Sequence, residues 1–441
     1  MLKILIRNLK FKNKFDFGEK SFFCGVFFLS SALPLSVIFF LVSISISLSI
    51  NKLLFFKDKY NQILFICTGL MIFSCINSTL NLSEITNKSV SDIFLGLGNW
   101  IPLFILFFSS QIYLKTSEKR KIFSKVIISG TIPVIISCIL QSVLNIYGPF
   151  EVLNGLIVWF QKPINNNEGV SGLFNNQNYA GLWLSSVLVF SIYEIKSAKR
   201  RIKNKFTAIF ITTLITYFLI LTNSRNALIG MLISIFSFVR RKYLLIIPIS
   251  IGTLLALKSL VFYYLNDYYF IFKNILNNSL FIKLFTFDFA NFLNYPRVEI
   301  YSLASRLILK SPLLGWGPST FPILYEKGWI INNPGVTEYP IHQHAHNIVF
   351  ELAYNFGIPL AIIMSFFIIK ILKNSFLVIY KNFQKNSDFL IDKTWFISVI
   401  IILVSHINDV TYYDGKISIL IWTLLAGLKC IIEQKKSKVM E

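Results

Sequence analysis

The chain has 441 residues, of which 54% are hydrophobic and only 15% are charged, and its formal net charge is +22. Soluble domains carry about a quarter charged residues, so this composition, with a mean hydropathy of +0.63, excludes an ordinary soluble protein and indicates an integral membrane protein. The positive charge alone would suit a nucleic-acid partner, but its distribution along the chain argues against that interpretation.

Apolar stretches close to the ~20 residues that cross a bilayer recur along the whole chain. The first of them, 22–50, is interrupted at Pro34 and can be either one broken helix or a pair. Counted as a pair, it begins a series of twelve predicted spanning helices: 22–33, 34–50, 62–80, 92–114, 122–147, 178–195, 206–222, 224–239, 243–261, 348–372, 394–409 and 416–433. The predicted fold is therefore all-α, a polytopic integral membrane protein.

Basic residues gather on one side of this topology. With the N-terminus inside, 32 of the 43 Lys and Arg residues fall in the cytoplasmic segments 1–21, 51–61, 115–125, 194–205, 240–242, 370–393 and 429–441. Cytoplasmic loops carry such an excess, and the asymmetry holds only if the run 22–50 is two spans. Both termini are then cytoplasmic, and the positive charge orients the chain and contacts anionic headgroups, with no role in binding nucleic acid.

Spanning helices, in place of alternating strands, predict an inner or plasma membrane and not an outer one. We divide the chain into spans one to nine (1–261), a large outer loop (262–347), and the last three spans with a cytoplasmic tail (348–441). The three parts are expected to form one integrated membrane domain.

Two outer segments are large enough to carry function. In the first, 147–177, the Asn and Gly residues that lead to Asn178 predict a turn and the start of the sixth span, and Asn178 is better suited to cap that helix than to contact a ligand. The second is the loop 262–347, which is too long for an unstructured connection.

Inside that loop, residues 263–293 are rich in Phe, Tyr, Ile and Leu and suit helices that lie on the membrane interface. Pro296 is typical of a first helical turn and predicts a helix to about Leu309. The segment 311–318 follows as a rigid turn, in which Gly315 and Gly317 would let the backbone come close to a ligand.

Histidine is concentrated at one point. Three of the four histidines, His342, His344 and His346, stand just before the apolar run 348–372. A metal site is one interpretation, because alternate residues of an extended segment point the same way. A buried, satisfied histidine is a second, although it explains one imidazole and not three. The third is a general base, since imidazole titrates near neutral pH.

Two arginines favour the general base. Arg225 lies in a tight outer turn between the seventh and eighth spans, where a guanidinium is unfavourable unless an anion meets it; snorkelling to the headgroups is the alternative. Arg297 stands at the first turn of the loop helix, where its partner could simply be Glu299. Arginines beside a neutral imidazole suit transfer from a diphosphate donor, because they neutralise the leaving group while the imidazole takes a proton from the attacking hydroxyl. His406 and Asp409, near the outer end of the eleventh span, could border the same cavity, but solvation at the helix end is the expected role of both.

Four motifs, in this order, resemble the O-antigen ligase and O-antigen polymerase superfamily, bacterial polytopic enzymes that move lipid-linked glycans outside the inner membrane. The motifs are the turn 172–178, Ser224-Arg225, Arg297 followed by Pro312 and Gly315-Trp316-Gly317, and His346-Asn347 followed by Gly357. Three positions depart from the pattern common in relatives: Tyr301 replaces the usual Trp, Asn355 the usual Glu, and Leu360 a small or hydroxyl residue.

The resemblance implies a metal-independent, inverting membrane glycosyltransferase of GT-C-like architecture that uses no cofactor. By similarity, Arg225 and Arg297 hold the diphosphate of an undecaprenyl-diphosphate-linked glycan, and His346 activates the acceptor hydroxyl at the periplasmic face. The positions that could support this site are His342, His344, Asn347, Asn178, Gly315 and Gly317.

The acceptor implied by the resemblance is a lipid A core sugar for a ligase or another lipid-linked glycan for a polymerase, with membrane lipids around both. Transport of a small anion such as bicarbonate is an alternative of a different class. Transport predicts broken helices and polar residues at midplane in internally repeated halves, and the sequence shows no such repeat. A zinc enzyme is the third possibility, and sensitivity to a chelator would reveal it.

Overall fold

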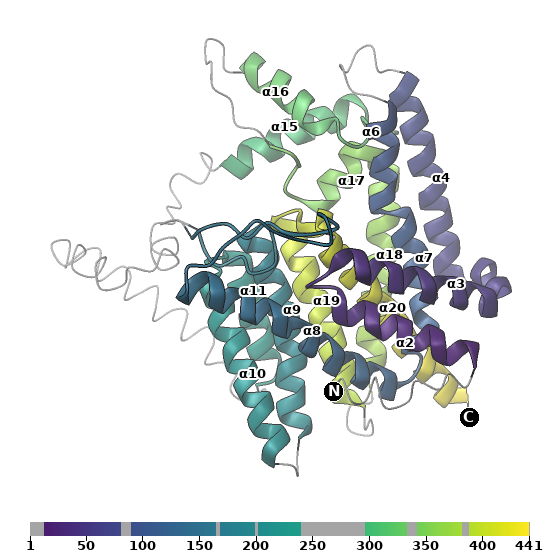
Figure 1. The fold of residues 1–441 in the computed structure, drawn as a ribbon. Helices are drawn as coiled ribbons and strands as arrows, with labels where there is room; N and C mark the ends of the chain where they lie inside the picture. The colour runs from purple at the N-terminus through teal and green to yellow at the C-terminus, as the bar shows by residue number, and fades with distance from the viewer. Residues whose placement is uncertain are drawn as a thin grey trace, which may run out of the picture. The chain divides into compact units, whose positions relative to one another are not determined.

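The computed structural model describes residues 13–80, 90–164, 168–198, 202–239, 296–332, 342–381 and 388–440. The chain divides into two compact units, one formed by Met1–Pro133 with Leu293–Glu441 and the other by Val134–Phe292. Nearly all of the regular structure is helical (Figure 1). The exception is a pair of antiparallel strands in the second unit, β1 (Phe150–Val152) and β2 (Ile157–Trp159), which the sequence did not predict.

The first unit begins with two helices from the apolar run at its N-terminus. Helices α2 (Lys14–Phe28) and α3 (Leu33–Lys57) pack side by side (Figure 1). Pro34 stands in the first turn of α3, where a helix does not need the missing N–H. The run is therefore a pair of helices, as predicted, although α2 begins at Lys14 instead of residue 22.

The remaining elements of this unit include the long C-terminal helix α20, which packs against α7, α18 and α19. They are α4 (Lys59–Leu80), α6 (Val90–Leu95), η1 (Gly96–Asn99), α7 (Ile101–Leu114), α8 (Ser117–Val143, whose residues after Pro133 belong to the second unit), α15 (Pro296–Lys310), α16 (Phe321–Asn332), α17 (Ile348–Phe356), α18 (Ile358–Tyr380), α19 (Phe389–Asn408), η5 (Thr411–Tyr413) and α20 (Gly415–Met440). The predicted start of the loop helix at Pro296 is confirmed.

A glycine divides the tenth predicted span into two helices. α17 ends at Phe356, and Gly357, with a φ of 91°, separates it from α18. A Cβ at Gly357 would overlap the carbonyl group of Leu313, so the turn 311–318 packs directly against this break. The prediction of one helix over 348–372 is wrong, because an apolar run does not reveal a backbone that only glycine adopts readily. The histidines consequently precede the short helix α17 and not a spanning helix.

Among the described residues, eight helices are long and apolar enough to cross a membrane: Leu33–Asn51, Lys59–Leu80, Val90–Leu114, Ser117–Val143, Asn204–Leu221, Ile358–Tyr380, Phe389–Asn408 and Gly415–Lys435. Helices α2, α9 and α11, which occupy predicted spans, are not in this group. The predicted ninth span, 243–261, and the predicted interfacial helices in 263–293 lie outside the described residues. The chain is a multi-pass helical membrane protein, and the count of twelve stays a prediction.

The second unit is built on α9 (Gln177–Ser197), which packs against α10 (Ile202–Leu221) and α11 (Arg225–Ser237) (Figure 1). Most of α9 is buried. A Cβ at Gly181 would lie 2.6 Å from the Cβ of Ala227, so glycine at this position lets α9 approach the start of α11 closely.

Candidate active site

Asn347 fixes the position of the backbone that carries His346. As the N-cap of α17, it accepts hydrogen bonds at Oδ1 from the N–H groups of Val349 and Phe350, at 2.9 and 3.2 Å. Its Nδ2 donates to the carbonyl oxygen of Ile407 in α19 at 3.0 Å. His346 itself has a φ of 52°, a left-handed conformation that a non-glycine residue keeps only when its surroundings hold it there.

His346 pairs with a carboxylate at the end of α19. Its Nδ1 lies 2.9 Å from Oδ1 of Asp409. Burial opposes ionisation of Asp409, but the hydrogen bond and charge of His346, together with the charge of Arg297, outweigh it and lower the pKa of Asp409. An ionised carboxylate only accepts hydrogen bonds, so Nδ1 of His346 carries a proton toward Asp409. Nε2 is then the nitrogen that remains available as a base.

Helix α15 supplies two further groups to this pair. Arg297, its second residue, is exposed, and its charge acts on both Asp409 and Tyr301. The hydroxyl of Tyr301 donates to the carbonyl oxygen of His346 at 3.2 Å. The ring of Tyr301 also packs edge-on against Phe350, with centroids 5.4 Å apart. The tyrosine thus ties α15 to the segment that carries His346.

His344 belongs to a second histidine–carboxylate pair. Its Nδ1 lies 3.4 Å from Oε1 of Glu351, whose side chain is 3% exposed, and its ring stacks on Tyr413. Glu351 also accepts hydrogen bonds from the Tyr413 hydroxyl at 2.9 Å, from Nδ2 of Asn355 at 3.0 Å and from the N–H of Ala345 at 3.0 Å. Burial opposes ionisation of Glu351, but His344 and these donors outweigh it and lower its pKa.

His342 lies between two other rings. It makes edge-on contacts with Tyr325 and with His346, with centroids 5.1 and 5.7 Å apart. Burial, followed by the charge of His346, lowers the pKa of His342, which keeps its imidazole neutral near pH 7. Within the described part of the chain, no three His, Cys, Asp or Glu side chains form a group that could hold a metal ion. The cluster therefore consists of two separate pairs and a third ring.

The turn 311–318 holds the other end of α17. The N–H groups of Trp316 and Gly317 donate to the carbonyl oxygens of Tyr354 and Asn355, at 2.8 and 2.9 Å. At Gly315, φ is 68°, and a Cβ there would lie 2.5 Å from the carbonyl oxygen of Tyr354. The close approach at Gly315 is thus made by the backbone of α17, and a ligand contact at either glycine stays a prediction.

Arg225 belongs to the second unit, where it is the exposed first residue of α11. Ser224 caps this helix, and its Oγ accepts a hydrogen bond from the N–H of Ala227 at 3.4 Å. The segment that leads into α9 lies against the same turn, because the N–H of Val170 donates to the carbonyl oxygen of Leu221 at 2.9 Å. The first two motifs of the sequence thus lie in this unit on neighbouring segments, and the last two lie in the first unit.

Asn178 is not the cap of α9. The cap is Asn176, whose Oδ1 accepts a hydrogen bond from the N–H of Asn178 at 2.7 Å. The prediction is wrong by two residues, because both positions are asparagine and capping preference alone cannot separate them. Asn178 lies in the first turn of the helix.

Asp409 is the residue that the sequence analysis missed. The expectation that it is merely solvated at the end of a span is wrong, since it pairs with His346. The two residues are 63 positions apart, so no local pattern joins them. The available signal was topological: a carboxylate directly after a predicted span, on the same side of the membrane as the histidines.

Comparison with known families gives a match over the part of the chain that contains most of these residues. Residues 208–365 match the sequence profile of a family described as O-antigen ligase. This range contains Arg225, Arg297 and His346 but ends before Asp409. No curated protein was found to match the chain.

Proposed function

The chain belongs, through residues 208–365, to the O-antigen ligase family, and from this premise we propose that it is a membrane glycosyltransferase of the ligase or polymerase type. It moves a glycan from undecaprenyl diphosphate to a sugar hydroxyl at the periplasmic face of the bacterial inner membrane, with both termini in the cytoplasm. The observation that carries the proposal is the pairing of His346 with Asp409 at 2.9 Å, within reach of the charge of Arg297.

In the proposed reaction, Nε2 of His346 takes the proton of the acceptor hydroxyl while the hydroxyl oxygen attacks the anomeric carbon of the donor sugar. The bond between that carbon and the diphosphate oxygen breaks, and undecaprenyl diphosphate leaves with the electron pair. Attack on the face opposite the leaving group inverts the anomeric configuration. Asp409 stabilises the imidazolium that forms, which afterwards releases its proton to water.

The two arginines are suited to bind the leaving group, which is a diphosphate. A guanidinium presents several N–H donors in a planar fork that matches phosphate oxygens. Arg225 and Arg297, both exposed at the first turn of a helix, can meet an anion without losing an internal partner that holds the fold. We assign them to the diphosphate, where they neutralise the charge that develops as the bond breaks.

The proposal is tested with purified full-length protein in proteoliposomes. The donor and acceptor are the lipid-linked glycan and the lipopolysaccharide core extracted from cells that lack this gene. We expect glycosylated acceptor and undecaprenyl diphosphate in equal amounts, with the anomeric configuration inverted. Folded protein that transfers the glycan to neither the core nor a second lipid-linked chain would overturn the proposal.

The same assay addresses the metal. Proton transfer by His346 and charge neutralisation by arginines need no metal ion, so we expect EDTA to leave the rate unchanged. Activity that is lost in EDTA and restored by zinc would contradict this mechanism and favour a zinc enzyme.

A lipopolysaccharide gel of the deletion strain separates the two types of enzyme. Accumulated lipid-linked polymer with none on the core indicates a ligase, and a single repeat on the core indicates a polymerase.

A further inference from the structure

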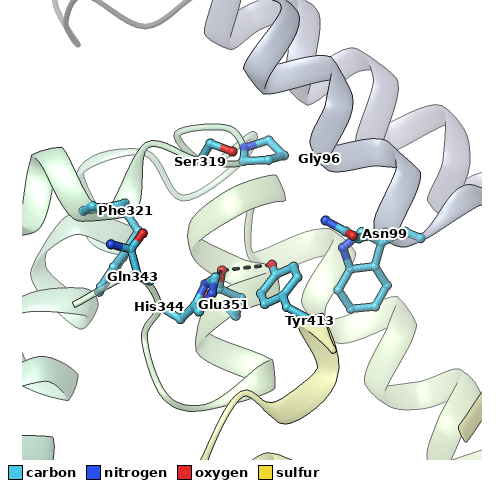
Figure 2. A pocket seen from close by; sticks show the side chains of 11 residues that line it. Gly96, Asn99, Ser319, Phe321, Gln343, His344, Glu351 and Tyr413 are labelled. Carbon is cyan, nitrogen blue, oxygen red and sulfur yellow. Dashed lines mark hydrogen bonds and ion pairs between the residues drawn. The ribbon is translucent and has the colours of Figure 1, made fainter. Parts of the chain in front are cut away.

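A pocket in the first unit lies beside the His344–Glu351 pair, and the proposed reaction does not say what it holds. Figure 2 shows the side chains that line it. Its volume is about 240 Å³. Pockets for drug-sized ligands measure roughly 300–1,000 Å³. This pocket therefore suits one ring and not an oligosaccharide.

Two amide side chains stand on opposite sides of the pocket. Asn99, at the end of η1, lies on one side, and Gln343 lies on the other (Figure 2). Both residues are exposed, and neither amide hydrogen-bonds to another residue that the structure describes. An amide offers two N–H donors and one carbonyl acceptor. Each can therefore bind a ligand hydroxyl without first giving up a partner in the described part of the protein.

Contacts with neighbouring residues hold the backbone that carries these two amides. Gln343 directly precedes His344, which is held by its contact with Glu351 and its stacking on Tyr413. The carbonyl oxygen of Asn99 accepts a hydrogen bond from the hydroxyl of Tyr412 at 2.9 Å. Both amides are thus carried by backbone that is anchored to the turn η5, which means that the pocket is organised before a ligand arrives.

The charge of the lining shows which ligands suit the pocket. Of its described lining residues none is Lys or Arg, and Glu351 is the one acid. A diphosphate would find the carboxylate of Glu351 here and no lysine or arginine. Trp100 and Phe321 also line the pocket, but their side chains are buried, and the ring of Trp100 stacks on Tyr412. The two exposed amides are therefore the groups that match a ligand with several uncharged hydroxyl groups.

We propose that this pocket binds one uncharged sugar ring of the glycan, with the amides of Asn99 and Gln343 hydrogen-bonded to its hydroxyls. The inference rests on the proposed glycosyl transfer and adds to it the residues that select the sugar. The ring belongs either to the acceptor or to the donor glycan, and both share the chemistry that the pocket recognises.

The test compares Asn99→Ala, Gln343→Ala and the double variant with the wild type in the transfer assay, with the extracted donor and acceptor varied separately. We expect each single variant to raise the half-saturating concentration of one substrate roughly fivefold, the loss of one neutral hydrogen bond, with little change in kcat. A rise for the acceptor identifies the ring as the acceptor's, and a rise for the donor identifies it as the donor's. Asn204→Ala, an exposed amide in α10, is the matched control and should change neither value.

If the double variant keeps the wild-type half-saturating concentration for both substrates, the proposal that the pocket binds a sugar ring is wrong. Titration of the two extracts onto His346→Ala protein, followed by its melting temperature, measures binding without transfer. Binding that weakens with Asn99→Ala and Gln343→Ala supports the pocket even if the wild type transfers nothing, a result that would overturn the reaction alone. If both substitutions leave binding unchanged, the proposed sugar pocket is wrong and the proposed reaction is unaffected.

Discussion

The two histidine–carboxylate pairs, His346–Asp409 and His344–Glu351, start only two residues apart in the chain but have different surroundings. The first has a nitrogen–oxygen distance of 2.9 Å and a carboxylate side chain that is 13% exposed; the second has a distance of 3.4 Å and a carboxylate that is 3% exposed. Asp409 lies within reach of the charge of Arg297. Glu351 instead accepts hydrogen bonds from uncharged donors at both of its oxygens.

This difference shows what a carboxylate adds to a histidine in each setting. The oxygens of Glu351 accept hydrogen bonds that join the start of α17 to η5, so the charge of Glu351 stabilises the fold. Asp409 orients one nitrogen of His346, and the charge of Arg297 acts on the same carboxylate. In the proposed reaction, the same two side-chain types therefore support proton transfer in one pair and hold the floor of the pocket in the other.

The largest expected effect is a loss of transfer rate on substitution of His346, much greater than the loss that the same substitution of His344 should produce. His346→Ala should lower the transfer rate about 10²–10⁴-fold, the usual contribution of a general base, while the melting temperature changes little. His344→Ala, the matched variant two residues away, should lower the rate less than tenfold, because it disturbs the pocket and not the base. Initial rates of glycan transfer at saturating substrate measure both. Equal losses in the two variants would remove the distinction between the pairs.

Asp409→Asn should produce the next largest loss, about 10–100-fold in kcat. The asparagine amide can donate toward Nδ1 and so favours the tautomer whose free lone pair is on the wrong nitrogen. Asp414→Asn, which changes a carboxylate five residues further along, serves as the control and should reduce kcat much less. A wild-type kcat in Asp409→Asn would mean that His346 does not depend on this carboxylate.

The fold class could be predicted because it depends on local composition. Apolar runs indicated the helical membrane protein, and Pro296 marked the start of α15. The choice of His346 among the histidines came from the resemblance and stays a prediction. Asp409 could not be predicted as its partner, because that contact forms only when the end of α19 reaches the start of α17. The interaction joins residues 63 positions apart.

The break at Gly357 was missed for a different reason. Residues 348–372 are apolar throughout, and hydropathy does not distinguish one helix from two in such a run. The backbone turns at Gly357 because the turn 311–318 packs there, which is a tertiary contact. Gly357 was visible in the sequence as part of a motif, but its role in ending α17 was not.

Arg297→Lys tests whether the arginine beside the His346–Asp409 pair binds the diphosphate. We expect a smaller effect, about a tenfold rise in the half-saturating concentration of the donor. Lysine keeps the charge but loses the planar fork that binds two phosphate oxygens at once. Arg306→Lys, exposed on the same helix, is the control and should leave the donor concentration unchanged. An effect on the acceptor alone would contradict the assignment of Arg297 to the diphosphate.

Glu351→Gln should have the smallest effect on the transfer rate, less than fivefold, and act mainly on stability. The substitution removes the charge from a buried site with several hydrogen-bond donors, so the free energy of unfolding should fall by about 1.5–3 kcal/mol. In the folded protein the pKa of Glu351 lies below its ordinary value of 4.5. Its contribution is therefore complete above about pH 4.5 and is lost as the pH falls through the lower folded value.

The melting temperatures of the wild type and of Glu351→Gln should consequently differ above about pH 4.5 and converge in more acidic buffer. Glu299→Gln, exposed on α15, controls for the general effect of removing a carboxylate. A difference between wild type and Glu351→Gln that persists undiminished in acid would mean that the charge of Glu351 does not stabilise the fold. A role in stability would then no longer distinguish Glu351 from Asp409.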